Sequence, residues 1–106
     1  EGDLDGTSFA GFMHHARPQG GQDYFSTKVD HTSWNVYEIL WTPGRVEFWV
    51  NDQIIGVSTN DVPSTPMRWV LQMETTITAS APPKSAQGHV QIDWVKAYSY
   101  KPTAST

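Results

Sequence analysis

Apolar and polar residues alternate with a period of two in several short stretches of the chain, and this pattern predicts β-strands. In the stretch 45–50, for example, the apolar side chains of Val46, Phe48 and Val50 share one face. Five further stretches alternate in the same way: 8–15, 35–41, 53–58, 67–75 and 89–100. Helical spacing does not persist over three turns anywhere in the chain, so the sequence predicts an all-β fold.

Turn-forming residues separate these predicted strands. Asn51 and Asp52 lie between the stretches 45–50 and 53–58, and both residue types tolerate positive φ, so the pair predicts a tight hairpin. Proline lacks a ladder donor and is typical of loops. The stretches rich in proline and glycine are therefore predicted loops: 17–21, 42–44, 63–66 and 81–84.

The last predicted strand is apolar on both of its faces. Val90, Ile92 and Trp94 alternate onto one face. Val95 and Ala97 lie on the other. Such a strand requires cover from both sides, and about six strands are too few for a complete two-sheet sandwich. The sequence therefore predicts a covering partner, either an N-terminal segment of comparable size or a second copy of the chain.

Composition narrows the classes of function. The chain has 106 residues, which allows one small domain at most. It carries 7 Lys and Arg against 11 Asp and Glu, for a net charge of −4, so it has no basic footprint for nucleic acid or an anionic membrane. No apolar run approaches the roughly 18 residues of a membrane span. The absence of cysteine excludes disulfides, a catalytic thiol and thiolate metal sites within this chain.

Three stretches, in this order and spacing, carry a resemblance to a known family: WTPGRVEFWVNDQ at 41–53, VPSTPMRWVLQ at 62–72 and VQIDWVKAY at 90–98. They resemble, respectively, the Trp-x-Pro hairpin, the cleft-lining loop and strand, and the closing strand of glycoside hydrolase family 16, the laminarinase and lichenase family. The resemblance implies a concanavalin A-like jelly-roll β-sandwich. Residues 1–100 would supply about half of that sandwich, and residues 101–106 a tail or the start of a linker.

The family's catalytic motif is Glu-x-Asp-x-x-Glu, or Glu-x-Asp-x-Glu without a bulge, because alternate residues of a strand face one cleft. Retaining hydrolysis needs the two outer carboxyls about 5–5.5 Å apart. Glu1 has two interpretations: the final Glu, which acts as general acid/base with the nucleophile upstream of this chain, or the first residue of a motif completed by Asp3 and Asp5. The downstream register, with a strand at 8–15, favours the first. The glycines in 2–6 also favour a turn there.

The resemblance also implies sugar-binding residues. His14 matches a histidine near the sugar in laminarinase-type members, while His15 alternates to the opposite face. Arg68, Gln72 and Glu74 share the polar face of the cleft-lining strand. The first two are suited to hydrogen-bonding sugar hydroxyls. Glu74 stands where lichenases often carry a Trp, which departs from the pattern for mixed-linkage glucan.

A structural Ca²⁺ is the one cofactor that the resemblance implies. Family members often bind this cation on the convex face through an Asp of the closing strand and backbone carbonyls of earlier segments. Asp93 matches that Asp, and hard oxygen ligands suit the cation. The remaining ligands would lie largely upstream of this chain.

As a whole, the resemblance implies part of a secreted, retaining endo-β-glucan hydrolase that acts on β-1,3- or mixed-linkage glucan. This chain by itself is expected to be inactive, and no signal peptide is visible in it. The alternative is a non-catalytic carbohydrate-binding jelly-roll module that binds glycans on its aromatic rings and is completed by dimerisation or by a second chain. A proteolytic piece still packed against its other half is compatible with the enzyme.

Overall fold

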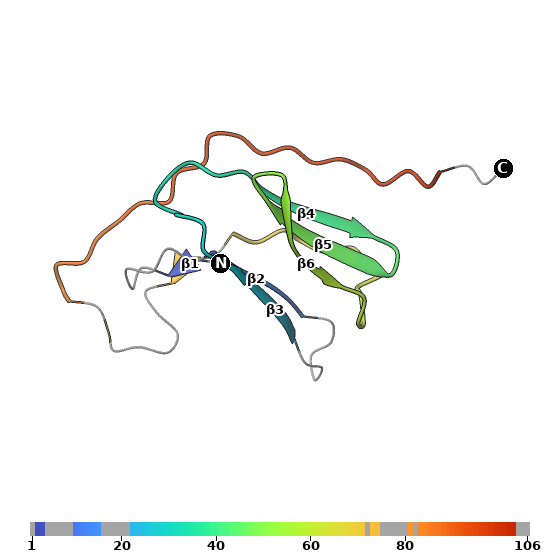
Figure 1. Cartoon of the computed structure of the whole chain (residues 1–106), viewed down its shortest axis with the longest axis horizontal. Coiled ribbons are helices and arrows are strands. Elements are labelled where there is room, and N and C mark those ends of the chain that lie inside the picture. Colours follow the sequence, from blue (N-terminus) through green and yellow to red (C-terminus); the bar gives the residue numbers. More distant parts are fainter. Residues whose placement is uncertain are drawn as a thin grey trace.

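The computed structural model describes residues 2–3, 10–15, 22–71, 73–74, 81 and 83–103. These residues form seven β-strands (Figure 1): β1 Gly2–Asp3, β2 Ala10–His15, β3 Gln22–Thr27, β4 Tyr37–Thr42, β5 Arg45–Val50, β6 Gln53–Ser58 and β7 Met73–Glu74. No helix occurs among the described residues, and so none there is long and apolar enough to cross a membrane. The predicted all-β fold is confirmed.

The strands form two sheets. One has the order β3-β2-β1-β7, and the other has the order β4-β5-β6. Neighbouring strands are antiparallel, apart from β1 and β7, which are parallel. This arrangement of mostly antiparallel strands in two sheets is consistent with part of a jelly-roll sandwich.

The core lies on one face of β5, the middle strand of the three-stranded sheet. Val46, Phe48 and Val50 are 2–4% exposed, as the alternation of their sequence predicts. Phe25 of β3 packs on them from the other sheet, with its ring centroid 5.7 Å from that of Phe48. Three further partly buried side chains complete the cluster: Val29, Ile55 and Val62. The two sheets therefore meet at β3, β5 and β6.

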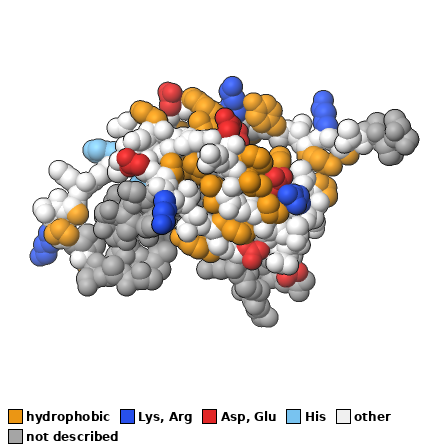
Figure 2. Space-filling view, in the orientation of Figure 1, with side chains coloured by type: hydrophobic (Ala, Val, Ile, Leu, Met, Phe, Trp, Pro, Cys, Tyr) orange, Lys and Arg blue, Asp and Glu red, His pale blue; other side chains and the backbone are white. Residues whose placement is uncertain are grey.

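The core ends abruptly at β4. Ile39 and Trp41 are in register with Phe48 and Val46, so they share the core face, yet they are 49% and 40% exposed. The chain exposes 8709 Å² in all, whereas a compact monomer of this size exposes about 6,000 Å². Figure 2 shows hydrophobic side chains gathered over the three-stranded sheet. The open side agrees with the prediction that the chain holds about half of a sandwich.

A left-handed turn joins β5 to β6, as predicted. Asn51 and Asp52 have φ of 49° and 64°, the combination typical of a type I′ hairpin. The Asn51 side chain also fastens this turn to the entry of β4. Its Oδ1 accepts a 2.9 Å hydrogen bond from the Val36 N–H, and its Nδ2 donates to Asn35 Oδ1 at 2.8 Å.

Several sequence predictions differ from the structure. Within the predicted strand 67–75 only Met73–Glu74 forms a strand among the described residues, and the predicted strand 89–100 is extended coil. A strand requires a neighbouring strand to accept and donate its backbone hydrogen bonds. Among the described residues of the two stretches, only β7 has such a neighbour, which is β1. The predicted turn over 2–6 is wrong at Gly2–Asp3, which form β1.

The strand β3 was not predicted at all. Its six residues are mostly polar, and Phe25 is the one strongly apolar residue that its core-facing positions carry. A single aromatic does not produce a visible alternation. The strand forms because its backbone pairs with β2 along all six residues and because Phe25 reaches the core.

Gly56 of β6 makes the contact between the sheets possible. It is in register with Phe48, and a Cβ added to it would overlap the ring of Phe25. We expect Gly56→Ala to lower the free energy of unfolding by about 1–3 kcal/mol, the usual cost of overpacking. Urea unfolding followed by tryptophan fluorescence measures this change.

The control for this prediction is the same substitution in a Phe25→Ala background. Removing the ring removes the overlap, so Gly56→Ala should cost clearly less there. An equal cost in both backgrounds would show that Phe25 is not the reason for the glycine.

Candidate functional site

The backbone brings the start of the chain into the middle of the four-stranded sheet. β1 lies between β2 and β7, with Gly2 opposite both Ala10 and Met73, and Asp3 opposite Glu74. Cross-strand neighbours share a face, so positions 3 and 74 lie on one face of the sheet and positions 2, 10 and 73 on the other. Two predicted site segments that are far apart in sequence are thus adjacent in this sheet.

Glu1 and Gln72 immediately precede these two strands in the sequence. Both lie outside the described residues. Their predicted roles, as general acid/base and as a sugar-binding amide, therefore stay predictions. Glu74 is placed by its backbone in β7, opposite Asp3, and its role in binding sugar also stays a prediction.

The register of β2 and β3 separates the two adjacent histidines. His14 is opposite Asp23, and His15 is opposite Gln22. The carboxylate of Asp23 accepts a short hydrogen bond from the Ser58 hydroxyl of the other sheet, so position 23 faces that sheet. By strand alternation, position 14 lies on this inner face, and position 15 lies on the face that carries positions 3 and 74. The predicted role of His14 near the sugar stays a prediction.

Arg68 lies apart from these strands in the described structure. It belongs to the coil that precedes β7 and is exposed. Its neighbours Trp69 and Val70 are also exposed, at 53% and 70%. The shared polar face predicted for Arg68, Gln72 and Glu74 requires a continuous strand, and residues 67–71 do not form one.

Asp93 lies on the exposed extended segment near the C-terminal end. Among the described residues, no group of three or more His, Asp and Glu side chains could hold a metal ion. One exposed carboxylate does not fit a calcium site by itself, because Ca²⁺ takes six to eight oxygen ligands. The calcium prediction therefore depends on further oxygen ligands beside Asp93 and stays a prediction.

A polar turn before β4, which sequence reasoning missed, is built on Asp30. Its carboxylate accepts hydrogen bonds from the Thr32 hydroxyl and N–H and from the Ser33 hydroxyl, and these bonds, led by the Thr32 hydroxyl, lower the pKa of Asp30. Asn35 then donates from its side chain to the Asp30 and Ser33 carbonyls, at 2.8 and 3.0 Å. The Asp-x-Thr-Ser pattern was the available signal, since Asp side chains commonly bond the backbone two residues on.

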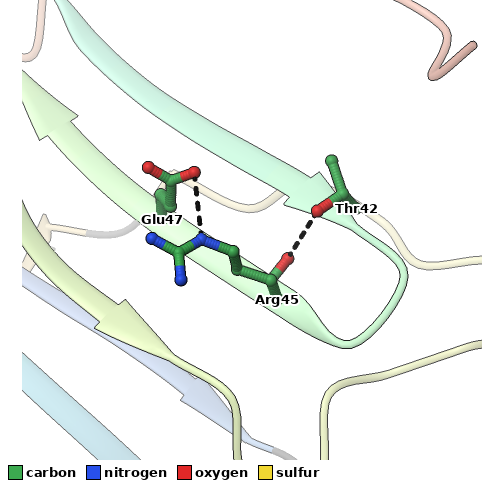
Figure 3. Close-up of polar contacts among 3 residues, drawn as sticks. All are labelled: Thr42, Arg45 and Glu47. Carbon is green, nitrogen blue, oxygen red and sulfur yellow. Dashed lines mark hydrogen bonds and ion pairs between the residues drawn. The ribbon is translucent and has the colours of Figure 1, made fainter. Parts of the chain in front are cut away.

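An ion pair marks the beginning of β5 on the face opposite to the core (Figure 3). Arg45 Nε lies 3.3 Å from Glu47 Oε2, and the Arg45 carbonyl accepts a 3.4 Å hydrogen bond from the Thr42 hydroxyl across the hairpin. The Arg45 side chain is 47% exposed, so the pair contributes at most about 1 kcal/mol. Together with the Thr42 hydrogen bond, the ion pair holds the start of the hairpin of β4 and β5.

Burial at the edge of the core also affects one phenol. The pKa of Tyr37 at the start of β4 is raised, chiefly because partial burial disfavours the charged phenolate. Tyr37 is in register with Val50. Its ring therefore lies on the core face of the three-stranded sheet, beside Val50.

Comparison with models of protein families identifies a family for this chain. The sequence model of the family described as "Glycosyl hydrolases family 16" matches residues 9–96, which is well over half of the chain. The matched region runs from β2 to the extended segment near the C-terminal end. It includes the stretches 41–53 and 62–72 and residues 90–96 of the third stretch that carries the resemblance. Searches of curated proteins and of solved structures find no match.

The Asp30 turn gives a prediction for acid. Its folded-state pKa lies below the ordinary aspartate value of 3.8. The charged carboxylate therefore stabilises the fold above that pH, and this contribution is lost as pH falls through the lower pKa of the folded state. Asp30→Asn should therefore lower the urea midpoint near pH 6, and the difference from the unaltered chain should shrink below about pH 3.8.

Thr32→Val is the matched comparison, since it removes the hydroxyl that lowers this pKa most. With Asp30 in place, Thr32→Val should lower the urea midpoint more at pH 6 than below about pH 3.8. In the Asp30→Asn background, its effect on the midpoint should not depend on pH. A difference between Asp30→Asn and the unaltered chain that is constant from pH 2 to 6 would contradict the linkage.

Proposed function

Because the chain belongs to the glycosyl hydrolases of family 16, we propose that it is part of a retaining endo-β-glucan hydrolase that acts on β-1,3- or mixed-linkage glucan. The observation that supports this most is the position of β1. The strand that directly follows Glu1 lies between β2 and β7, inside a sheet rather than at its edge. A catalytic motif that enters the sheet at this point would have strands on both sides to hold its carboxyls.

In the proposed mechanism Glu1 is the general acid/base. It protonates the leaving oxygen, and a Glu upstream of this chain attacks the anomeric carbon to form a glycosyl-enzyme. Glu1 then removes a proton from the water that releases the sugar. Position 1 alternates with position 2 along the strand, so it would share a face with positions 3 and 74. Desolvation and neighbouring carboxylates would keep the acid protonated near neutral pH.

The proposed sugar contacts are Arg68, Gln72, Glu74 and one histidine of β2. This is His14 by the family resemblance, or His15 by the register, which puts position 15 on the face of positions 3 and 74. In the described structure Arg68 is exposed and free of any strand, which would let it adjust to a bound glycan. We place the enzyme outside the cell, where its polymeric substrate is found. This localisation follows from the family resemblance alone.

A carbohydrate-binding module without catalysis is the second candidate, and exposed aromatic rings favour it. Trp34, Trp69 and Trp94 are 53–68% exposed, and flat rings stack on the apolar faces of sugars. Such rings serve an enzyme and a binding module equally. The two candidates therefore differ only in whether a substitution of Glu1 changes a rate.

The first test is Glu1→Gln in the protein with the residues that precede Glu1 in place. Loss of the acid/base should lower kcat/KM on laminarin or lichenan by about 10²–10⁴, while calorimetric affinity for gluco-oligosaccharides is kept. In a second variant, Glu1→Ala, which truncates the side chain, added azide should restore turnover of an aryl glycoside whose leaving group needs no protonation. The product should be the β-glycosyl azide, because azide attacks from the side that Glu1 vacates.

The controls are Asp3→Asn and Asp5→Asn. Under the proposal they retain most of the activity, since neither residue is the acid. If Asp5→Asn abolishes turnover as fully as Glu1→Gln does, then Glu1, Asp3 and Asp5 form the whole motif. If the unaltered protein hydrolyses no β-glucan, Glu1→Gln has no rate to change. That outcome would identify the protein as the binding module.

The two histidines offer a paired comparison. If His14 contacts the sugar, His14→Ala should lower kcat/KM by about tenfold, the value of one hydrogen bond of about 1.4 kcal/mol, and His15→Ala should not. The register assigns the face of positions 3 and 74 to position 15. If His15→Ala lowers kcat/KM and His14→Ala does not, then His15, and not His14, contacts the sugar.

A further inference from the structure

The segment that follows β6 turns back over the core face of the three-stranded sheet. The strand β6 ends at Ser58, which is in register with Val46 of β5. Beyond it the chain turns at Asp61, whose φ of 45° lies in the left-handed region. Val62 then packs on the core cluster to which Val46 belongs. The segment thus leaves the edge strand β6 and covers part of the middle strand β5.

A side-chain hydrogen bond ties the same segment to β4. The indole Nε1 of Trp41 donates to the Pro63 carbonyl oxygen at 2.9 Å. Trp41 shares the core face because it is in register with Val46, so the bond reaches the segment on the side where Val62 packs. Two successive residues, Val62 and Pro63, are therefore held to two neighbouring strands of one sheet.

Burial along the segment ends at the residue that accepts this bond. Val62 and Pro63 are partly buried, whereas each of the residues 64–71 is exposed. In Figure 1 the chain then continues, in yellow, to β7, which pairs with β1 in the other sheet. Among the described residues, Pro63 is thus the last partly buried point before the chain reaches the strand beside β1.

We infer that the hydrogen bond from Trp41 to Pro63 fixes the start of the segment 64–71 and so positions Arg68 for a bound β-glucan. The inference rests on the proposed function, in which Arg68 contacts the sugar. Arg68 lies five residues beyond Pro63 and, at about 3.3–3.6 Å per residue, stays within roughly 18 Å of it. Trp41 belongs to the other sheet and acts on the glycan only through this segment, as a positioning residue.

The physical basis is the entropy of ordering. With the bond in place, the segment is anchored immediately before its exposed part. Without the bond, the residues before Arg68 gain freedom back towards Ser58, the last residue of β6. Ordering a longer free segment on a glycan costs more conformational entropy, so the affinity falls although Arg68 itself is unchanged.

The test is a double-mutant cycle on the affinity for laminari-oligosaccharides and mixed-linkage gluco-oligosaccharides, measured by calorimetry in the protein with the residues that precede Glu1 in place. Trp41→Phe removes the only donor of the side chain and keeps an aromatic ring. It should raise Kd by about threefold to tenfold, the value of one net hydrogen bond. In an Arg68→Met background, which lacks the guanidinium, it should change Kd by less than about twofold.

A bond that only stabilises the fold would give another pattern. Trp41→Phe would then lower the urea midpoint, but its effect on Kd would be the same with Arg68 and with Arg68→Met. That outcome, or an unchanged Kd in a protein whose Arg68→Met variant binds more weakly, would overturn the inference. Trp49→Phe is the matched control. Trp49 belongs to β5 and lies on the face opposite to the core, so this substitution should leave Kd unchanged.

Backbone ¹⁵N relaxation of the sugar-free protein separates this inference from the proposed function. The order parameters of residues 64–68 should fall below about 0.6, the flexible range, in Trp41→Phe and not in Trp49→Phe. Unchanged order parameters in Trp41→Phe would overturn the anchor, whatever the glycan affinity. Lowered order parameters in a protein that binds no gluco-oligosaccharide would support the anchor and overturn the proposed function instead.

Discussion

The contact of Phe25 with Phe48 is the interaction on which the rest of this structure depends. It is the point at which a side chain of the four-stranded sheet enters the core of the three-stranded sheet. Gly56 of β6 leaves the space that the ring of Phe25 fills. Two residues further along β6, the Ser58 hydroxyl donates a hydrogen bond to Asp23 of β3. Burial of one such ring stabilises by about 1.5–3 kcal/mol, which is a large fraction of what a small domain has.

This contact also connects the strand that follows Glu1 with the three-stranded sheet. β3 carries Phe25 and pairs along its length with β2, and β2 pairs with β1. The strand next to Glu1 is thereby tied, through two ladders and one aromatic contact, to the hairpin of β5 and β6. In the retaining hydrolase that we propose, this connection would help to hold two carboxyls at a fixed separation.

Local sequence signals predicted β2, β4 and the hairpin of β5 and β6, but they missed β3 and predicted strands over 67–75 and 89–100 that, among the described residues, the structure contains only at Met73–Glu74. The strands Arg45–Val50 and Gln53–Ser58 and the left-handed turn between them follow from alternation and from Asn51-Asp52, because a hairpin needs only neighbours in sequence. The segment 89–100 has an equally clear alternation but is coil here. Alternation determines which side chains share a face of a strand, but it does not provide a neighbouring strand to pair with. Of the predicted site, the backbone brings Glu74 beside β1, whereas Arg68 and Asp93 lie in coil. The sequence could name these residues through the family, but their assembly depends on pairing between distant strands.

The most direct test of the account is the stereochemistry of hydrolysis. The protein with the residues preceding Glu1 in place should be incubated with laminarin or lichenan, and the anomeric protons of the first sugars released should be followed by ¹H NMR before mutarotation. Two carboxyls that act as nucleophile and acid/base predict that the β-anomer appears first. Initial release of the α-anomer would contradict the account, because the two carboxyls would then activate water directly and Glu1 would not be the acid/base of a retaining enzyme.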